Sequence, residues 1–330
     1  MSALDPNEVR FFSGSSNRQL AADIAGCLNV PLDATHISRF SNDNLYMQLG
    51  ASVRSRAVFI VQSLSPPVND HLIELLMMLD IARSAAAKEV HAIIPYFSFA
   101  RSDKKDAPRI SITARLVADL LQTAGATHVM TMMLHSPQVH GFFGVPTDPL
   151  TARPVFQEYF HGRDLPDTIV VAPDVGHIKS AARFAEDLGV PVAAGNKERL
   201  SDTKVRITGL VGHQVRGYRR ALIYDDEIAT GSSVIELCGL LIEHGVEEIV
   251  AVCTHGVFVG QALEELAAVP QITEIVTTDT VYIPPEKRLP HLHIVSVAPI
   301  FGEAIRRNYL HQSIGDLFVF GQDEDAARET

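Results

Sequence analysis

The chain has 330 residues, of which 28 are Lys or Arg and 39 are Asp or Glu, giving a formal net charge of -11. With 46% apolar and 20% charged residues, the composition is that of a globular protein, which excludes a disordered tail or a fibrous scaffold. At roughly 100–200 residues per domain two domains are expected, and the negative charge argues against nucleic-acid binding, because the summed field repels polyanions.

Three widely spaced cysteines, Cys27, Cys238 and Cys253, form no C-x-x-C pair, so the sequence predicts neither a disulfide framework nor a thiolate metal site. Residues 1–6 have neither the basic start nor the apolar run of a secretory signal. The longest apolar stretches are broken by charge well before the ~20 residues that cross a bilayer. We therefore expect a soluble, cytoplasmic protein with no membrane partner.

Short β-branched segments alternate with longer segments of helical period through most of the chain. The expected strands are residues 58–61, 92–94, 129–133, 169–171, 221–223, 249–253 and 294–297. Because these segments are apolar on both faces, we expect mostly parallel sheets flanked by helices, and hence an α/β fold. The stretch Val145-Pro-Thr-Asp-Pro149 interrupts the alternation and indicates a domain boundary near residue 150. The expected domains are residues 1–150 and 151–330, with the last segment a candidate to pack back on the first domain.

One internal echo links the two halves. Residues 121–135 align with residues 241–255 at a constant offset, and each copy contains a helix end, a Gly, a strand and a His. The glycines, Gly125 and Gly245, suit a left-handed helix stop. The histidines, His135 and His255, fall at the carboxyl ends of their strands, the edge at which open α/β sheets bind ligands. The shared pattern favours duplication over chance, so we expect two similar domains.

The strongest local signal lies between Arg220 and Leu237, where an apolar strand ends in Asp225 and Asp226 and a turn of small residues opens a helix. The turn comprises Ala229, Thr230, Gly231, Ser232 and Ser233. In such a turn the backbone N–H groups converge and the helix amino end adds partial positive charge, so a phosphate monoester is the expected ligand. The two carboxylates disfavour a phosphate and must serve otherwise, by accepting hydrogen bonds from sugar hydroxyls or by holding a divalent cation. A phosphorylated sugar satisfies both halves of this site.

A purely structural alternative is that Asp226 or Thr230 only caps the helix that starts near Ser232. Capping does not explain why two carboxylates directly follow an apolar strand. We therefore favour the ligand site and keep capping as the alternative.

This segment resembles the phosphoribosyl-diphosphate-binding loop of type I phosphoribosyltransferases and, more closely, that of the ribose-phosphate diphosphokinases. The resemblance runs in the family's order from about residue 11 to 318. It is carried by Phe12-Ser-Gly-Ser-Ser-Asn-Arg18, Arg39-Phe-Ser41, Arg101-Ser-Asp-Lys-Lys-Asp106, Leu134-His135, Gly141-Phe-Phe143, Pro173-Asp174, Lys197-Glu-Arg199, Thr254-His-Gly-Val-Phe258 and Ile314-Gly-Asp-Leu-Phe318. It implies two type I phosphoribosyltransferase-like domains, each with a mostly parallel sheet flanked by helices.

The resemblance implies an enzyme that transfers the diphosphoryl group of ATP to the 1-hydroxyl of ribose 5-phosphate, giving 5-phosphoribosyl 1-diphosphate and AMP, with Mg²⁺ as cofactor. Catalysis of such a transfer rests on positioning and on neutralising charge at the transferred oxygens. The family's pattern places Lys197 and Arg199 on a mobile catalytic loop over residues 194–202, as a point charge and a forked donor toward the phosphates. It makes Asp225, Asp226 and residues 229–233 the ribose 5-phosphate site, and it makes His135 and Asp174 metal ligands.

The ATP site that the resemblance implies has two segments in the first half of the chain. Its residues are Arg101, Ser102, Asp103 and Lys104 in one segment, and Phe40, Asn42, Asp43 and Asn44 in the other. The second segment matches one that an adjacent subunit offers to the adenine, through a stacking ring and polar side chains. A shared active site implies a homo-oligomer built from dimers, commonly a hexamer.

Several positions depart from the family's pattern. Met133 and Ala229 stand where an acid is common, Asn44 replaces an acid, and His177 replaces a Gly shortly after Asp174. Ser232-Ser233 replaces the usual Gly-Thr ending of the loop and keeps hydroxyl and amide donors for a phosphate. These changes leave the twin aspartates, the metal ligands and the Lys-x-Arg pair intact, so activity is favoured. Two alternatives stay open: a non-catalytic regulatory paralogue that assembles with an active synthetase, and a base-transferring type I phosphoribosyltransferase, which leaves the two nucleotide segments without a purpose.

Overall fold

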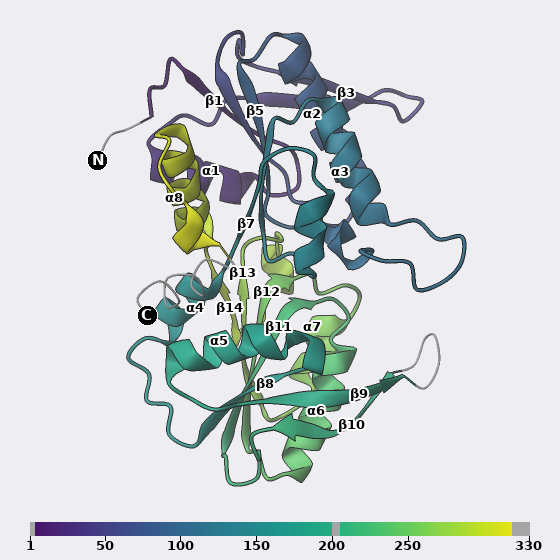
Figure 1. The fold of residues 1–330 in the computed structure, drawn as a ribbon, viewed down its shortest axis with the longest axis vertical. Coiled ribbons are helices and arrows are strands. Elements are labelled where there is room, and N and C mark those ends of the chain that lie inside the picture. Colours follow the sequence, from purple (N-terminus) through teal and green to yellow (C-terminus); the bar gives the residue numbers. More distant parts are fainter. Residues whose placement is uncertain (1–3, 200–204, 319–330) are drawn as a thin grey trace. The chain divides into compact units, whose positions relative to one another are not determined.

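The computed structural model describes residues 4–199 and 205–318, without the side chains of residues 197–199 and 205–208. The described chain forms two α/β units (Figure 1). Of the described residues, unit 1 takes those up to Ala152, the short segment Thr280–Tyr282 and those from Ser296 onward, and unit 2 takes those within Arg153–Asp279 and Ile283–Val295. The expected α/β class is confirmed.

Unit 1 is built on a five-stranded, all-parallel sheet in the order β1-β4-β5-β6-β7. Its strands are β1 (Val9–Ser13), β4 (Ala57–Val61), β5 (Glu89–Ile94), β6 (His128–Met132) and β7 (Thr147–Leu150), and its α-helices are α1 (Arg18–Leu28), α2 (Val68–Ser84), α3 (Thr113–Ala124) and α8 (Ala298–Tyr309). Within this unit α1 and α8 lie together on one side of the sheet, and α2 and α3 lie on the other (Figure 1). The central strands are therefore buried on both faces, as their apolar sequences require.

Two features of unit 1 differ from the simple alternation of strands and helices. Strands β2 (Thr35–Arg39) and β3 (Leu45–Leu49) form a separate antiparallel hairpin. Residues 147–150, expected to belong to a connection, form the edge strand β7 instead. Pro149 is compatible with this strand because an edge strand needs ladder hydrogen bonds on one side only.

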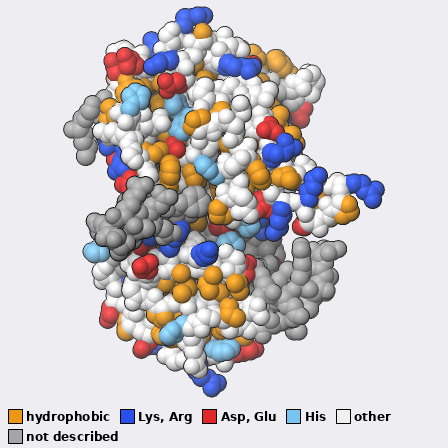
Figure 2. All heavy atoms as spheres, viewed as in Figure 1, with side chains coloured by type: hydrophobic (Ala, Val, Ile, Leu, Met, Phe, Trp, Pro, Cys, Tyr) orange, Lys and Arg blue, Asp and Glu red, His pale blue; other side chains and the backbone are white. Residues whose placement is uncertain are grey.

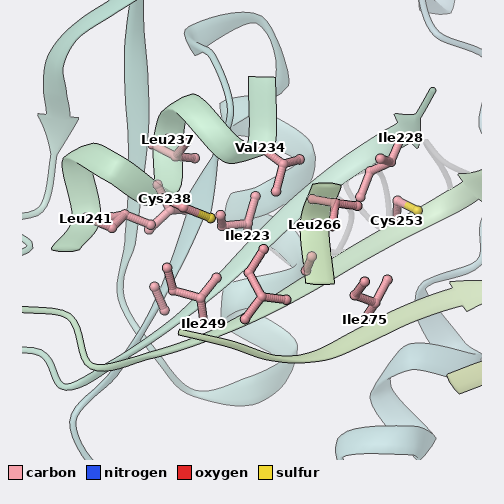
Figure 3. Packing of buried hydrophobic residues seen from close by; sticks show 14 of the residues in the cluster. Ile223, Ile228, Val234, Leu237, Cys238, Leu241, Ile249, Cys253, Leu266 and Ile275 are labelled. Carbon is pink, nitrogen blue, oxygen red and sulfur yellow. The ribbon is translucent and has the colours of Figure 1, made fainter. Parts of the chain in front are cut away.

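Unit 2 is built on a seven-stranded sheet in the order β10-β9-β8-β11-β12-β13-β14, in which only the pairing of β10 with β9 is antiparallel. Its strands are β8 (Thr168–Ala172), β9 (Val192–Arg199), β10 (Val205–Gly212), β11 (Arg220–Ile228), β12 (Glu248–Gly256), β13 (Ile272–Thr278) and β14 (Leu292–Val295), and its α-helices are α4 (Arg153–Phe160), α5 (Ile178–Leu188), α6 (Ser232–Glu243) and α7 (Ala262–Ala267). Figure 3 shows how α6 directs Leu237, Cys238 and Leu241 toward Ile223 of β11 and Ile249 of β12. This apolar contact fixes the start of α6 beside the end of β11.

The internal echo of the sequence corresponds to a repeated local structure. Helix α3 ends at Gly125, with φ 128°, before β6, and α6 is followed by Gly245, with φ 92°, before β12. Both glycines have positive φ, which disfavours any residue with a Cβ. In the part of the chain that the structure describes, no helix combines the length and the apolar character needed to cross a bilayer.

Candidate active site

Two neighbouring parallel strands, β8 and β11, deliver the acidic side chains of unit 2. Val171 of β8 is in register with Ile223 of β11. Asp174 follows the end of β8, and Asp225 and Asp226 lie in the last part of β11. Because parallel strands end at the same edge of the sheet, the three carboxylates come to one place.

A buried aromatic cluster supports this edge from within unit 2. Tyr224, which directly precedes the twin aspartates, is 1% exposed and stacks on Phe184 of α5 with ring centroids 4.5 Å apart. Phe156 of α4 contacts the same ring edge-on at 6.2 Å. These contacts anchor β11 against α4 and α5 and fix the position from which Asp225 and Asp226 project.

His177 lies at the centre of the carboxylates. It ends the short 3₁₀ turn η3 (Val175–His177), and its backbone N–H donates to Asp174 Oδ1 at 3.3 Å. Its ring atom Nδ1 lies 3.1 Å from Asp174 Oδ1 and 3.9 Å from Asp225 Oδ1, while Nε2 lies 3.4 Å from Asp226 Oδ1. One imidazole therefore touches all three acids.

The electrostatics of the cluster follow from burial and from mutual charge. Burial alone lowers the pKa of His177, but hydrogen bonds to Asp174 and Asp226 and the charges of Asp226 and Asp225 outweigh it and raise the pKa to about 11. Burial, followed by the charge of Asp226, raises the pKa of Asp225 well above its usual range, and His177 opposes this rise. At Asp225, burial and the repulsion from Asp226 thus outweigh the attraction to His177.

The turn after β11 leads directly into the amino end of α6. Gly231 is the N-cap residue of α6 and has φ 78°, a conformation that favours glycine. The carbonyls of Ile228 and Ala229 accept hydrogen bonds from the backbone N–H groups of Phe258 and Val259, which turns these carbonyls toward that segment. Thr230 Oγ1 and Ser232 Oγ lie 3.0 Å apart at the turn. The capping alternative is wrong, because the N-cap position belongs to Gly231, which has no side chain.

The donor set of this edge fits a hard divalent cation. Asp174, Asp225 and Asp226 offer carboxylate oxygens, the ligands that Mg²⁺ prefers. Their side chains are 23%, 13% and 8% exposed, so the charges are only weakly screened by water. Burial and, after it, the charge of Asp226 raise the pKa of Asp225, and a bound cation would favour its ionised form.

The expected nucleotide segment near residue 101 lines a pocket of unit 1. The pocket has a volume of about 370 Å³ and is lined by Ser98, Phe99, Arg101, Ser102, Asp103, Lys104, Asp106, Ile110 and Thr113. The Ser102 hydroxyl accepts a hydrogen bond from the Thr113 N–H at 3.2 Å, which ties the end of η1 (Ser98–Arg101) to the start of α3. Lys and Arg side chains gather on the segment that projects between η1 and α3 (Figure 2, right). The pocket lining thus combines cationic, acidic and apolar side chains.

The other nucleotide segment forms the tip of the β2–β3 hairpin in unit 1. Phe40 is 57% exposed and contacts Tyr46 edge-on at 5.9 Å. The tip is closed by backbone hydrogen bonds from the Phe40 N–H to the Asn44 carbonyl and from the Asp43 N–H to the Phe40 carbonyl, both 2.9 Å. Arg39 pairs with Asp43 at 2.9 Å and so braces the tip. The hairpin presents an aromatic ring to solvent on a closed turn.

Three further residues were expected in the site, namely His135, Lys197 and Arg199. His135 belongs to unit 1, where it follows β6 and is half-buried. The backbones of Lys197 and Arg199 belong to β9, and their side chains lie outside the described residues. The expectation of a loop over residues 194–202 is therefore wrong for residues 194–199, which pair with β10 in an antiparallel ladder. The structure brings together Asp174, Asp225, Asp226 and the turn at 229–233 within unit 2, whereas the nucleotide segments and His135 belong to unit 1.

Comparison with known proteins decides the family. Residues 9–125 match the model of the N-terminal domain of ribose phosphate pyrophosphokinase, and residues 197–319 match the phosphoribosyl synthetase-associated domain. A ribose-phosphate pyrophosphokinase of Deinococcus radiodurans is 46% identical over 93% of this chain and 97% of its own. One of Caldanaerobacter subterraneus is 41% identical over 95% and 98%. The chain belongs to the ribose-phosphate pyrophosphokinase family.

A solved structure of the same family supports the fold. The crystal structure of phosphoribosylpyrophosphate synthetase from Mycobacterium smegmatis covers 92% of this chain and 99% of its own, with a TM-score of 0.85 and 35% identity. The expected pair of phosphoribosyltransferase-like domains is confirmed. As a ribose-phosphate pyrophosphokinase, the chain is a transferase of nucleotide biosynthesis that moves the diphosphoryl group of ATP to ribose 5-phosphate.

The contacts of His177 were missed by reasoning from the sequence, which noted the residue only as a departure from the pattern of ribose-phosphate pyrophosphokinases. The available signal was its position three residues after Asp174, in the turn that follows a strand. A side chain on that turn can reach back to the same sheet edge, but its direction depends on the backbone of η3, which the sequence does not specify.

Proposed function

We propose that ribose 5-phosphate binds at the carboxyl edge of the unit 2 sheet, with its phosphate on residues 229–233 and its hydroxyls on Asp225 and Asp226. One observation carries this proposal: two buried carboxylates end β11 directly before a Gly-capped helix start, so acceptors for hydroxyls and donors for a phosphate are adjacent. Holding the sugar at both ends orients its 1-hydroxyl, which is the nucleophile toward the β-phosphorus of ATP, with AMP as leaving group.

The remaining roles follow the same chemistry. Lys197 is proposed as a point charge toward the transferred phosphate oxygens, and Arg199 as a forked donor to them. When bound, Mg²⁺ neutralises charge on the phosphates, and Asp174 is proposed as one of its ligands. The metal-binding role expected for His135 stays a prediction. These groups act on a reaction whose barrier is dominated by positioning and charge.

The nucleotide is proposed to use two segments of unit 1. Residues 101–104 bind the phosphates of ATP in the pocket described above, through Arg101 and Lys104. Phe40, with the tip residues Asn42, Asp43 and Asn44, stacks on the adenine of a neighbouring subunit. The enzyme is accordingly proposed to be a homo-oligomer built from dimers, such as a hexamer.

Calorimetric titration with ribose 5-phosphate tests the sugar site directly. Asp225→Asn replaces the carboxylate by a neutral amide acceptor, and since hydrogen bonds to charged groups contribute about 1 kcal/mol more than neutral ones, binding should weaken by roughly fivefold. The matched control is Asp164→Asn, which changes an exposed acid of the same unit and should leave the dissociation constant unchanged. Equal affinity of the Asp225→Asn variant and the wild type would remove the aspartate from the sugar site.

A further inference from the structure

The position of His177 has a consequence for cation binding at the proposed active site. The residue contributes two groups to Asp174 Oδ1, its backbone N–H at 3.3 Å and its ring Nδ1 at 3.1 Å. Its Nε2 faces Asp226 Oδ1 at 3.4 Å. The His177 side chain is 19% exposed, so it is inserted between the acids and does not project into solvent.

Carboxylate oxygens accept hydrogen bonds and do not donate them, so a hydrogen-bond donor and a metal ion compete for the same lone pairs. An oxygen that accepts hydrogen bonds from an imidazole and an amide offers fewer lone pairs to a metal ion. The acids that the imidazole contacts are also those best suited to a hard divalent cation, which takes oxygen ligands. A ring inserted among these acids and a cation bound by them therefore exclude one another.

We propose that His177 competes internally with the divalent cation for Asp174, while its contact with Asp226 holds the ring in place, so that cation binding requires the imidazole to leave Asp174. The inference rests on the proposed function in that it takes this sheet edge as the cation-binding part of the active site. It assigns His177 a role in setting cation affinity, distinct from any contact with the sugar or the nucleotide.

The probe is Mn²⁺ alone, which takes the same oxygen ligands as Mg²⁺, titrated calorimetrically into the full chain without sugar or nucleotide. His177→Ala removes the competing ring, and the affinity for Mn²⁺ should rise on the order of tenfold, the scale on which residues around a metal site change metal affinity. His177→Asn keeps a side-chain donor for Asp174 but none that reaches as far as Nε2, so its affinity should lie between the two. Val175→Ala alters an exposed residue of the same turn and should bind Mn²⁺ as the wild type does.

The outcomes separate this inference from the sugar site. Competition is supported if His177→Ala binds Mn²⁺ most tightly, His177→Asn less tightly and the wild type least tightly. A merely structural role of His177 would not tighten binding in either variant. Unchanged or weaker binding by both variants, each with a wild-type circular dichroism spectrum, overturns it, and weaker binding would make His177 a ligand. Loss of ribose 5-phosphate binding in Asp225→Asn is a separate measurement, so failure of either idea leaves the result for the other intact.

Discussion

At the residue scale, the buried imidazole of His91 gives unit 1 a defined pH dependence. His91 is 4% exposed, stacks on Phe59 with ring centroids 4.4 Å apart, and places Nδ1 3.0 Å from Nδ1 of His128. Burial, followed by the charge of His128, lowers the pKa of His91 to about 3. Glu89 approaches Nε2 to 3.2 Å but is 45% exposed, so water screens its attraction.

The sign of the effect follows from the lowered pKa. The unfolded chain binds a proton on His91 below about pH 6.5, whereas the folded chain stays neutral down to about 3. The stabilising contribution is therefore present above about pH 6.5 and is lost as the pH falls toward 3, at up to about 1.4 kcal/mol per pH unit. Urea unfolding between pH 7 and 5 should show a shallower loss of unfolding free energy in His91→Phe than in the wild type. The exposed His161→Gln variant should keep the wild-type slope, and an equal slope in all three proteins would contradict the prediction.

At the element scale, the return of α8 to unit 1 depends on a close approach between two helices. A Cβ placed on Gly302 of α8 would lie 2.8 Å from the Cβ of Cys27 on α1. Gly302→Ala should therefore lower the free energy of unfolding by about 1–2 kcal/mol, because overpacking outweighs the gain in helix propensity. Gly239→Ala provides the matched helical control, since a Cβ there meets nothing within 4 Å. This variant should raise the free energy of unfolding by up to about 1 kcal/mol. If both variants shift the urea midpoint in the same direction, the close approach of α8 to α1 does not determine the effect of Gly302→Ala.

The expected and observed strands show how far the sequence could predict this fold. Each expected strand overlaps a strand of the structure, because segments such as 58–61 are apolar on both faces, although the expected segment 294–297 shares only residues 294 and 295 with β14. The hairpin β2–β3 was not predicted, since its exposed, polar-rich strands lack that signature. The convergence of Asp174 with Asp225 could be expected from strand direction alone, whereas the contacts of His177 depend on the path of a short turn.

At the scale of the whole molecule, a shared active site predicts complementation between two defective chains. Lys197→Ala should lower kcat by more than about a hundredfold through loss of charge stabilisation. Phe40→Ala should lower kcat/KM for ATP by about tenfold or more, because stacking of a base on an aromatic ring contributes about 1–3 kcal/mol. If Phe40 serves the site of a neighbouring subunit, mixed oligomers contain sites in which both residues are intact.

Co-expression of the two variants in equal amounts should then restore up to about a quarter of the wild-type sites, since each site draws its two residues from different chains at random. The activity is measured as AMP release at low ATP concentration. Co-expression of Lys197→Ala with Arg199→Ala is the control. Each site takes both residues from the same β9 strand of one chain, so no site in the mixed oligomer can have both residues intact. Activity equal to the mean of the two parents would mean that each chain's hairpin serves its own site, which would end the argument for a site shared between subunits.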